Sequence, residues 1–162
     1  KETQVRVVLL VKLHDLPLPE GRGGILRLIS RTGEEAFFEL MQLKEADEKA
    51  KRADGRDTER TDAIKRTREL AARLIREGAC TDRAHLAVRG EDIMSLGIGG
   101  AGIGRALERA FYAVTDGLPN EKRAIMDFLK GEQRGCAPDG AAIKKEGTVQ
   151  IKEEKDGLSA EK

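Results

Sequence analysis

Aromatic side chains are scarce in this sequence: they form only 3% of the 162 residues, and tryptophan is absent. A core without them depends on leucine, isoleucine, valine and alanine, which bury less apolar surface per residue. Hydrophobic residues make up 39% of the chain and charged residues 36%, so the core is thin for this length. We therefore expect one domain or two small ones, arranged as an extended helical body.

Cysteines and long apolar runs are also lacking. Neither Cys80 nor Cys136 has a second cysteine or a histidine at metal-ligand spacing, which predicts free thiols in a reducing compartment. No apolar run approaches the ~20 residues that a membrane-spanning helix needs, and no signal-peptide pattern opens the chain. The sequence therefore predicts a cytoplasmic protein with no membrane partner.

Catalytic motifs are missing as well. Two-metal chemistry needs carboxylates held close together, and the chain contains no D-x-D motif. It also has no Ser-His-Asp or Cys-His arrangement with supporting context. His14 and Asp15 form an HD pair, but the only other histidine, His85, lies far along the chain in a different setting. A metal site of that type needs at least one more histidine and a distal aspartate, so we expect no catalytic and no metal-binding residues in this chain.

What the sequence does have is a dense glycine cluster between two segments that read as helices. Five of the 18 glycines fall within eight residues: Gly97, Gly99, Gly100, Gly102 and Gly104. Such a cluster indicates a shaped turn, because glycine allows positive φ and close backbone approach. The G-x-G-x-x-G spacing lacks a surrounding β-α-β unit, and no Lys-Ser or Lys-Thr follows to make a Walker loop. A helix-hairpin-helix module, which binds nucleic-acid backbone through amides, is the better reading of these residues.

The same region carries a family resemblance. The run LAVRGEDIMSLGIGGAGIGRAL, then LPN and an apolar final helix, resembles the carboxy-terminal tail of bacterial CCA-adding enzymes, the tRNA nucleotidyltransferases of the poly(A) polymerase superfamily. Upstream, LLVKLHDLPL, RTGEEAFFELMQLKEADEKAK and the helix ending in Cys80 resemble the part of those enzymes between the catalytic half and the tail. The match runs from Val5 to about Gly131 in the right order and spacing.

The resemblance implies an all-α fold with a helical body over residues 1–80, a tRNA-contacting helical tail over 81–131 and a flexible polar extension over 132–162. It implies addition of CMP and AMP to tRNA 3′ ends from CTP and ATP with magnesium. The family holds its D-x-D motif in an amino-terminal catalytic head, so the expected partners are tRNA and that head, in the same polypeptide. The alternative is a stand-alone helix-hairpin-helix-like nucleic-acid-binding module.

The amino-terminal part divides at glycines and prolines. Residues Val5 to Leu13 are apolar, and periodicity alone cannot distinguish a buried strand from a helix over so short a run; the family places a helix there. The chain opens with Lys1 rather than Met and enters this apolar run at once, so we expect a piece of a longer polypeptide. A break follows, built from Pro17, Pro19, Gly21, Gly23 and Gly24.

Two helices are expected after that break, a short one over Ile25 to Ser30 and a second from Glu34 onward. The second has the stripe Ala36, Leu40, Leu43, Asp47 and Ala50. Asp47 is the polar member of this stripe, and we expect it to cap or brace a neighbouring segment, because an unpaired buried carboxylate is costly. Residues 53–61 are expected to form a solvated loop.

A basic helix is predicted over residues 63–76. The net charge is only +1, but this segment holds Lys65, Arg66, Arg68, Arg73 and Arg76 on one face with a single acid, Glu69, opposite a mostly apolar face. The basic face is either a solvated helix face or a surface that meets RNA phosphates. Candidate RNA-binding residues are Lys65, Arg68, Arg73 and Arg76 here, and Arg89, Gly99, Gly100, Gly102, Gly104 and Arg105 around the glycine cluster.

The remaining signals mark helix ends and core faces. Gly78 is expected to end the basic helix, Thr81 or Asp82 to cap a short turn, and Asp92 to lie in the first turn of a helix leading to Leu96. A helix from about Ala101 should bury Ile103, Leu107, Ala110, Phe111 and Val114. Asn120 should cap a last helix, which should bury Ala124, Ile125, Phe128 and Leu129.

The missing carboxylates give a first prediction. When the chain alone is mixed with tRNA, CTP, ATP and magnesium, we expect no nucleotide incorporation, because nothing would hold the metals that activate the 3′ hydroxyl. Radiolabelled CTP and ATP measure this directly. Incorporation above a no-protein control would reveal an active site in this chain.

Overall fold

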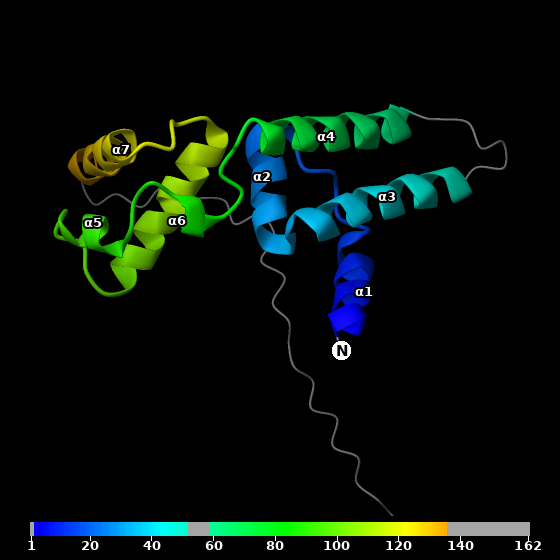
Figure 1. Ribbon diagram of the computed structural model, residues 1–162, viewed down its shortest axis with the longest axis horizontal. Coiled ribbons are helices and arrows are strands. Elements are labelled where there is room, and N and C mark those ends of the chain that lie inside the picture. Colours follow the sequence, from blue (N-terminus) through cyan, green and yellow to red (C-terminus); the bar gives the residue numbers. More distant parts are fainter. Residues whose placement is uncertain (1, 52–58, 136–162) are drawn as a thin grey trace, which may run out of the picture.

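The computed structural model describes residues 2–51 and 59–135, and the prediction of an all-α fold is confirmed there. Within these ranges the chain forms seven α-helices and one short 3-10 helix, without a β-strand. The helices are α1 (Glu2–Leu13), α2 (Gly21–Thr32), α3 (Glu34–Ala50), α4 (Glu59–Arg76), α5 (Gly90–Met94), α6 (Ala101–Asp116) and α7 (Lys122–Gly135), with the 3-10 helix η1 at Arg83–His85. In Figure 1, α3 and α4 lie side by side, α2 crosses at the centre, and α5 to α7 form a second group.

Buried apolar side chains gather in two separate clusters. The amino-terminal core contains Leu13, Ile25, Leu26, Ile29, Phe37, Leu40, Met41, Ile64, Ala71 and Leu74. The carboxy-terminal core contains Cys80, Leu86, Val88, Ile93, Ala106, Ala110, Phe111, Val114, Ile125 and Leu129. The two sets divide between Ala79 and Cys80. Whether residues 1–80 and 81–131 are independent domains stays a prediction.

Helix α2 begins earlier than expected. The predicted helix ran from Ile25 to Ser30, but α2 starts at Gly21, so Gly23 and Gly24 belong to the helix and not to the preceding break. Gly23 is buried, and its contact with α6 outweighs the poor helix propensity of glycine. Gly33, at φ 81°, separates α2 from α3.

Helix α3 presents a different face from the expected stripe. Its buried residues are Ala36, Phe37, Leu40, Met41 and Lys44, whereas Leu43 is 37% exposed. The bulky Phe37 and Met41 turn the helix toward the core, which moves Leu43 to the surface and Asp47 to the rim. Asp47 binds Lys51 at 2.6 Å, so its partner follows its own helix rather than lying in a neighbouring segment.

Helix α4 starts within the segment predicted as a loop. Residues 52–58 lie outside the described part, but Glu59 to Thr61 form the first turn of α4, and the Thr61 side chain is buried. The predicted end at Gly78 is confirmed: this residue has φ 73°. The amide of Ala79 bonds the Leu74 carbonyl at 3.0 Å, which completes a Schellman motif.

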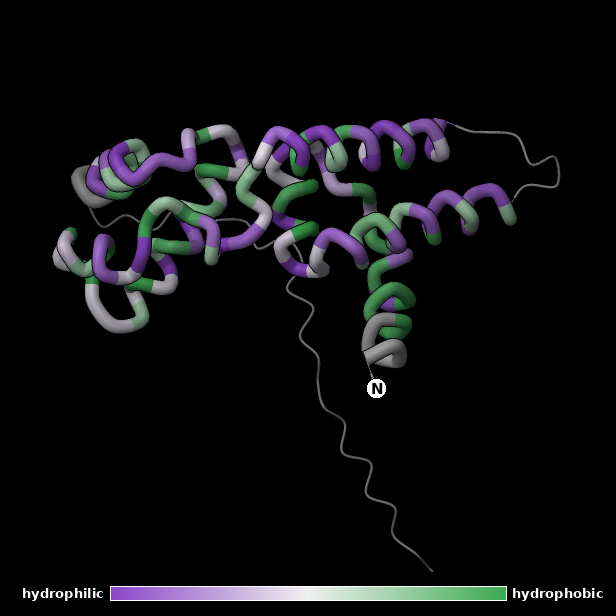
Figure 2. Tube along the Cα trace, viewed as in Figure 1, coloured by the Kyte–Doolittle hydropathy of each residue, from purple (hydrophilic) through white to green (hydrophobic). Residues whose placement is uncertain are grey.

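One apolar surface is left uncovered within the described part of the chain. Helix α1 turns Leu13 into the amino-terminal core, while Val7, Val8 and Val11 on its other side are each more than half exposed. Figure 2 shows α1 as a largely hydrophobic helix that stands away from the rest of the molecule. A helix that is apolar on several sides is usually buried on several sides.

Candidate nucleic-acid interface

The glycine cluster lies between α5 and α6. Helix α5 is fixed at its start by Asp92, whose carboxylate accepts the Arg89 amide at 2.8 Å, as expected for an acid in the first turn. After α5, the amide of Gly97 bonds the Met94 carbonyl at 2.9 Å. The backbone then turns through residues 97–100, which we call the glycine turn, and enters α6 at Ala101.

The glycine turn exposes a row of backbone donors. The amides of Gly102 and Ile103 bond the carbonyls of Gly99 and Gly100 at 3.0 and 3.2 Å. For the four amides of residues 98–101, the described part of the chain provides no acceptor. These amides precede and begin a 16-residue helix, where the helix dipole favours negative charge. The turn therefore has the hydrogen-bond donors and the favourable potential needed to bind an anion.

The space around each glycine separates their roles. Gly97 and Gly100 have φ of 77° and 54°, which other residues rarely adopt. A Cβ on Gly102 would lie 2.8 Å from Ile98 Cγ2, so this glycine allows local packing. A Cβ on Gly99 or Gly104 would meet nothing within 4 Å. Neither backbone conformation nor packing within the described residues explains glycine at these last two positions.

Two of the candidate arginines flank this turn along the chain. Arg89 immediately precedes α5 and Arg105 lies in the first turns of α6, and both are exposed. Within the described ranges, neither guanidinium group forms an ion pair, although the positive charge of Arg89 acts on the Asp92 carboxylate. Both side chains are therefore available to an external anion.

The basic helix α4 has the predicted division into two faces, but one arginine is occupied. Ile64, Ala71 and Leu74 are buried, and Arg73 and Arg76 are exposed. Arg68 instead reaches α3, where its guanidinium lies 3.3 Å from the Glu45 carboxylate. Lys65 is half-buried. The outward basic surface is thus narrower than the sequence suggested.

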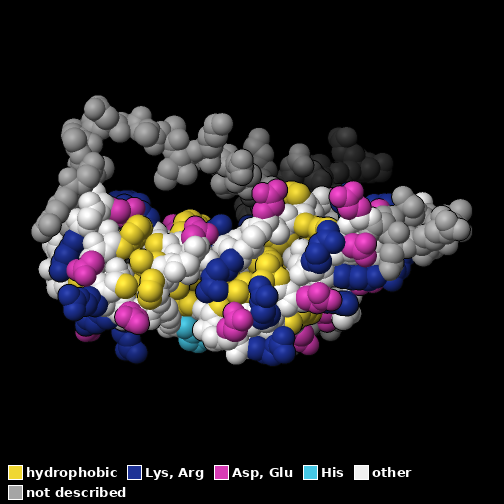
Figure 3. Space-filling model, turned by 90° about the horizontal axis from the view of Figure 1, so that it is seen from above, with side chains coloured by type: hydrophobic (Ala, Val, Ile, Leu, Met, Phe, Trp, Pro, Cys, Tyr) yellow, Lys and Arg dark blue, Asp and Glu magenta, His cyan; other side chains and the backbone are white. Residues whose placement is uncertain are grey.

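The two groups of candidate residues do not form one site. In Figure 1 the turn between α5 and α6 and the helix α4 occupy separate parts of the molecule. Figure 3 looks down on the molecule from above, and basic and acidic side chains alternate over the visible face. At the end of α4, the Arg73 guanidinium lies 3.9 Å from the carboxylate of Glu77, which directly follows the helix. Any ligand that met both groups would have to be large.

Asn120 has a role that the sequence did not indicate. It was expected to cap the last helix, but α7 starts at Lys122, and the first helical bond runs from the Ile125 amide to the Glu121 carbonyl at 3.0 Å. The Asn120 side chain instead donates to the His85 carbonyl and accepts from the Ala87 amide, both at 2.9 Å. It joins the segment before α5 to the segment before α7.

A second link supports the same segment. The ammonium group of Lys122 lies 2.5 Å from the Asp92 carboxylate, which ties the start of α7 to the start of α5. The Lys122 contact, followed by the Arg89 amide, lowers the pKa of Asp92.

The predicted cap at Asp82 is confirmed, since its carboxylate accepts the Ala84 amide at 2.8 Å. The predicted α6 stripe is confirmed for Ala110, Phe111 and Val114, which are buried, while Ile103 and Leu107 pack partly buried beside them.

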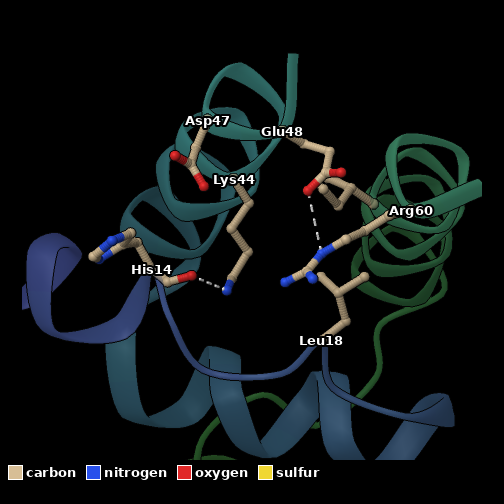
Figure 4. A pocket seen from close by; sticks show the side chains of 7 residues that line it. His14, Leu18, Lys44, Asp47, Glu48 and Arg60 are labelled. Atoms are coloured by element: carbon tan, nitrogen blue, oxygen red, sulfur yellow. Dashed lines mark hydrogen bonds and ion pairs between the residues drawn. The ribbon is translucent and has the colours of Figure 1, made fainter. Parts of the chain in front are cut away.

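A small pocket lies in the other half of the molecule. It has room for at most about one water molecule, about 10 Å³, and is lined by His14, Leu18, Lys44, Asp47, Glu48, Arg60 and Ile64. As Figure 4 shows, Arg60 reaches Glu48, at 3.5 Å, and Lys44 reaches the His14 carbonyl.

The described residues contain no group of three histidines, cysteines, aspartates or glutamates that could hold a metal ion.

Lys44 is the most unusual residue of this pocket. Its side chain is buried, and its ammonium group donates to the carbonyls of His14 and Leu16, both at 2.5 Å. These carbonyls follow α1, so Lys44 fixes the end of α1 against α3. Burial, followed by repulsion from Arg60, lowers the pKa of Lys44. The contacts give this lysine a structural role.

Cys80 is a buried free thiol, and burial raises its pKa, which disfavours the reactive thiolate. Cys136 lies outside the described residues, as does nearly all of the predicted extension over 132–162, although α7 continues to Gly135. None of the helices in the described ranges is long and apolar enough to span a membrane.

Comparison with known proteins yields no relative. No protein-family model matches the sequence, and neither the curated proteins nor the solved structures include a match. The resemblance to CCA-adding enzymes therefore rests on the motifs of the chain itself.

The role of Lys44 can be tested by replacing it with methionine, which keeps the apolar stem and removes the ammonium group. We expect Lys44→Met to lower the free energy of unfolding by about 1–3 kcal/mol, because two carbonyls lose their donor. Lys49→Met removes one partner of Glu45, whose carboxylate keeps Arg68 at 3.3 Å, and should change stability by no more than about 0.5 kcal/mol. Urea denaturation measures both. If the two variants are equally stable, the two hydrogen bonds of Lys44 only offset the cost of burying its ammonium group.

The Asp92–Lys122 contact should make stability depend on pH. Because the folded state lowers the pKa of Asp92, its contribution is present at neutral pH, above the ordinary pKa of an aspartate, and is lost as the pH falls through the lowered pKa of the folded state. Asp92→Asn should therefore lose less stability than the wild type between about pH 6 and pH 3. Asp127→Asn removes the longer surface contact with Arg123, at 3.9 Å, and should keep the wild-type pH profile. Chemical denaturation at each pH provides the comparison, and parallel wild-type and Asp92→Asn profiles would contradict the assignment.

Proposed function

We propose that this chain is the tRNA-binding body and tail of a CCA-adding tRNA nucleotidyltransferase, with the catalytic head elsewhere in the same polypeptide. The observation that carries the proposal is the glycine turn, which occurs within the sequence motif that resembles the family tail. It combines free amides, a helix amino terminus and two glycines, Gly99 and Gly104, that the fold itself does not require.

An RNA phosphate would explain those features together. The amides of residues 98–101 supply neutral donors, and the α6 dipole adds favourable potential. A missing Cβ at Gly99, Gly100 and Gly104 lets a phosphate approach the backbone. Arg89 and Arg105 supply positive charge on either side of the turn in sequence. Such contacts position RNA without reading its sequence, which suits a protein that must accept many tRNAs.

Helix α4 is the second proposed contact. Arg73 and Arg76 are exposed on it, and both would meet phosphates of a large ligand that also reaches the glycine turn. Lys65 and Arg68 contribute less in this proposal, because both are half-buried and Arg68 is already paired with Glu45. The size and bent shape of tRNA fit two separate contacts better than a short duplex does.

The role of the chain in the proposed reaction is positioning. Magnesium, CTP and ATP would be held by the head, where the metal ions activate the 3′ hydroxyl. The residues of this chain bind the body of the tRNA and direct its 3′ end toward the head. The uncovered valines of α1 give such a head an apolar surface to pack against.

A second candidate is a stand-alone helix-hairpin-helix module that binds duplex DNA. It is favoured by the succession of α5, the glycine turn and α6, in which two glycines with positive φ join two helices. Both candidates bring phosphate to the same amides. They differ in ligand, because a DNA module needs no bent RNA and makes no use of α4.

Binding to a tRNA transcript tests the proposal. Arg89→Glu with Arg105→Glu should weaken binding and reduce the slope of log affinity against log salt by roughly 0.7–0.9 for each lost phosphate contact. Arg73→Glu with Arg76→Glu should act in the same direction. Fluorescence anisotropy across a salt series measures affinity and slope together.

The matched control reverses two exposed charges on α7. Arg123→Glu with Lys130→Glu changes the net charge by the same amount but alters neither proposed contact, so any loss should be small and non-specific. Circular dichroism verifies that each variant stays helical. Equal losses in all three double variants would reduce the proposal to bulk electrostatics. Tighter binding to duplex DNA than to tRNA, with no effect of the α4 variants, would favour the second candidate.

A further inference from the structure

The two apolar cores are joined by a contact between α2 and α6 that includes polar groups. Helix α2 supplies Ile25, Leu26 and Ile29 to the amino-terminal core, and α6 supplies Ala106, Ala110 and Phe111 to the carboxy-terminal core. The two helices also pack against each other at the centre of the molecule, as Figure 1 shows. Interfaces of this kind between cores allow relative motion unless they are large and apolar. The groups at the α2–α6 contact therefore decide how firmly the two halves are held.

Arg27 of α2 makes two hydrogen bonds and one cation–π contact to α6. One guanidinium nitrogen donates to Asp116 Oδ1 at 2.8 Å and to Thr115 Oγ1 at 3.1 Å. The guanidinium carbon lies 5.3 Å from the centroid of the Tyr112 ring, within the range of a cation–π contact. Thr115 is itself buried, and its hydroxyl donates to the Tyr112 carbonyl at 2.9 Å. A single side chain thus engages the last turn of α6 in three ways.

Gly23 makes room for this arrangement. A Cβ at this position would overlap Asp116 Oδ1 and lie 2.8 Å from an Arg27 guanidinium nitrogen. Both atoms are at the ends of side chains, so an alanine would displace the ion pair without forcing the helix backbones apart. The neighbouring Gly24 differs, because its Cβ would make only ordinary contacts of 3.4 Å and more with Pro19.

Asp116 is poorly placed for the stability of its own helix. It is the last residue of α6, where the helix dipole disfavours a negative charge. The Arg27 guanidinium compensates for this charge from the neighbouring helix. The carboxylate therefore serves the contact between the helices rather than the helix that carries it.

We propose that Gly23, Arg27 and Asp116 form a latch that fixes the orientation of the two cores relative to each other. Arg27 is a positioning residue: it sets where the glycine turn lies relative to α4. The side chains of Arg27 and Asp116 are 34% and 59% exposed, so salt screens their attraction. The latch as such is independent of the proposed function, whereas its importance for tRNA binding rests on that function.

Distances between two spin labels test the latch directly. The labels are attached at Gln42→Cys on α3 and Arg123→Cys on α7, in a Cys136→Ser background, and the buried Cys80 thiol is left in place. Pulsed electron spin resonance should give a narrow distance distribution for the wild-type latch. Arg27→Gln and Gly23→Ala should each broaden it, and Asp116→Asn serves as a further variant should one of them fail to fold.

Matched controls lie on the same helix. Gly24→Ala makes the same chemical change as Gly23→Ala, and Arg31→Gln makes the same change as Arg27→Gln at an exposed residue. Both controls should retain the narrow distribution. If the folded Arg27 and Gly23 variants keep it as well, the latch does not hold the two cores, and the proposal is overturned.

The link to RNA is measured on the same proteins without labels. A ligand that contacts both halves loses affinity when their spacing is no longer fixed, so Arg27→Gln should bind tRNA several-fold more weakly than Arg31→Gln. A short RNA hairpin that reaches only one half should bind both variants equally. Broadened distances with unchanged tRNA affinity would support the latch and overturn its role in RNA binding. If the wild type fails to bind tRNA, the proposed function fails, while the distance measurement still decides the latch.

Discussion

Close approach between α2 and α6 is the constraint on which the shape of this molecule depends. With few aromatic residues the chain builds two modest cores instead of one large one, and each core uses a different set of helices. Helix α2 lies at the boundary, where Gly23 leaves room for the Asp116 carboxylate of α6 and for the Arg27 guanidinium. The polar groups there are well satisfied, because Arg27 has a carboxylate, a hydroxyl and an aromatic ring as partners.

The glycines illustrate how one residue type serves different physical needs. Gly33 and Gly78 separate helices through positive φ, Gly23 leaves room for the Arg27–Asp116 ion pair, and Gly97 shapes the turn before α6. None of these needs applies to Gly104, since it lies inside α6 at an exposed position with open space around it. A glycine inside a helix lowers helix stability. Because Gly104 brings no benefit to the fold, a bound ligand is the natural reason for it.

Sequence patterns predicted the helices well where apolar residues repeat with a period of 3.6, as in Ala110 to Val114 of α6. They failed where the deciding partner is distant in sequence. Nothing local indicates that Asn120 binds backbone near His85, or that Lys44 enters the core to reach carbonyls after α1. The start of α2 was misjudged for the same reason. The sequence identified Gly99 and Gly104 among the candidate RNA-binding residues, but it could not indicate that Arg68 is paired with Glu45.

The glycine turn has a further consequence through its rigidity. Amide-to-carbonyl bonds on both sides hold it, from Gly97 to Met94 and from Gly102 to Gly99, and the positive φ of Gly100 is maintained between them. The conformational entropy of these residues is therefore already lost when the protein folds. An anion that reached the turn would meet amides whose directions are set in advance, so ordering the backbone would add little to the cost of binding. Weak individual contacts can then suffice.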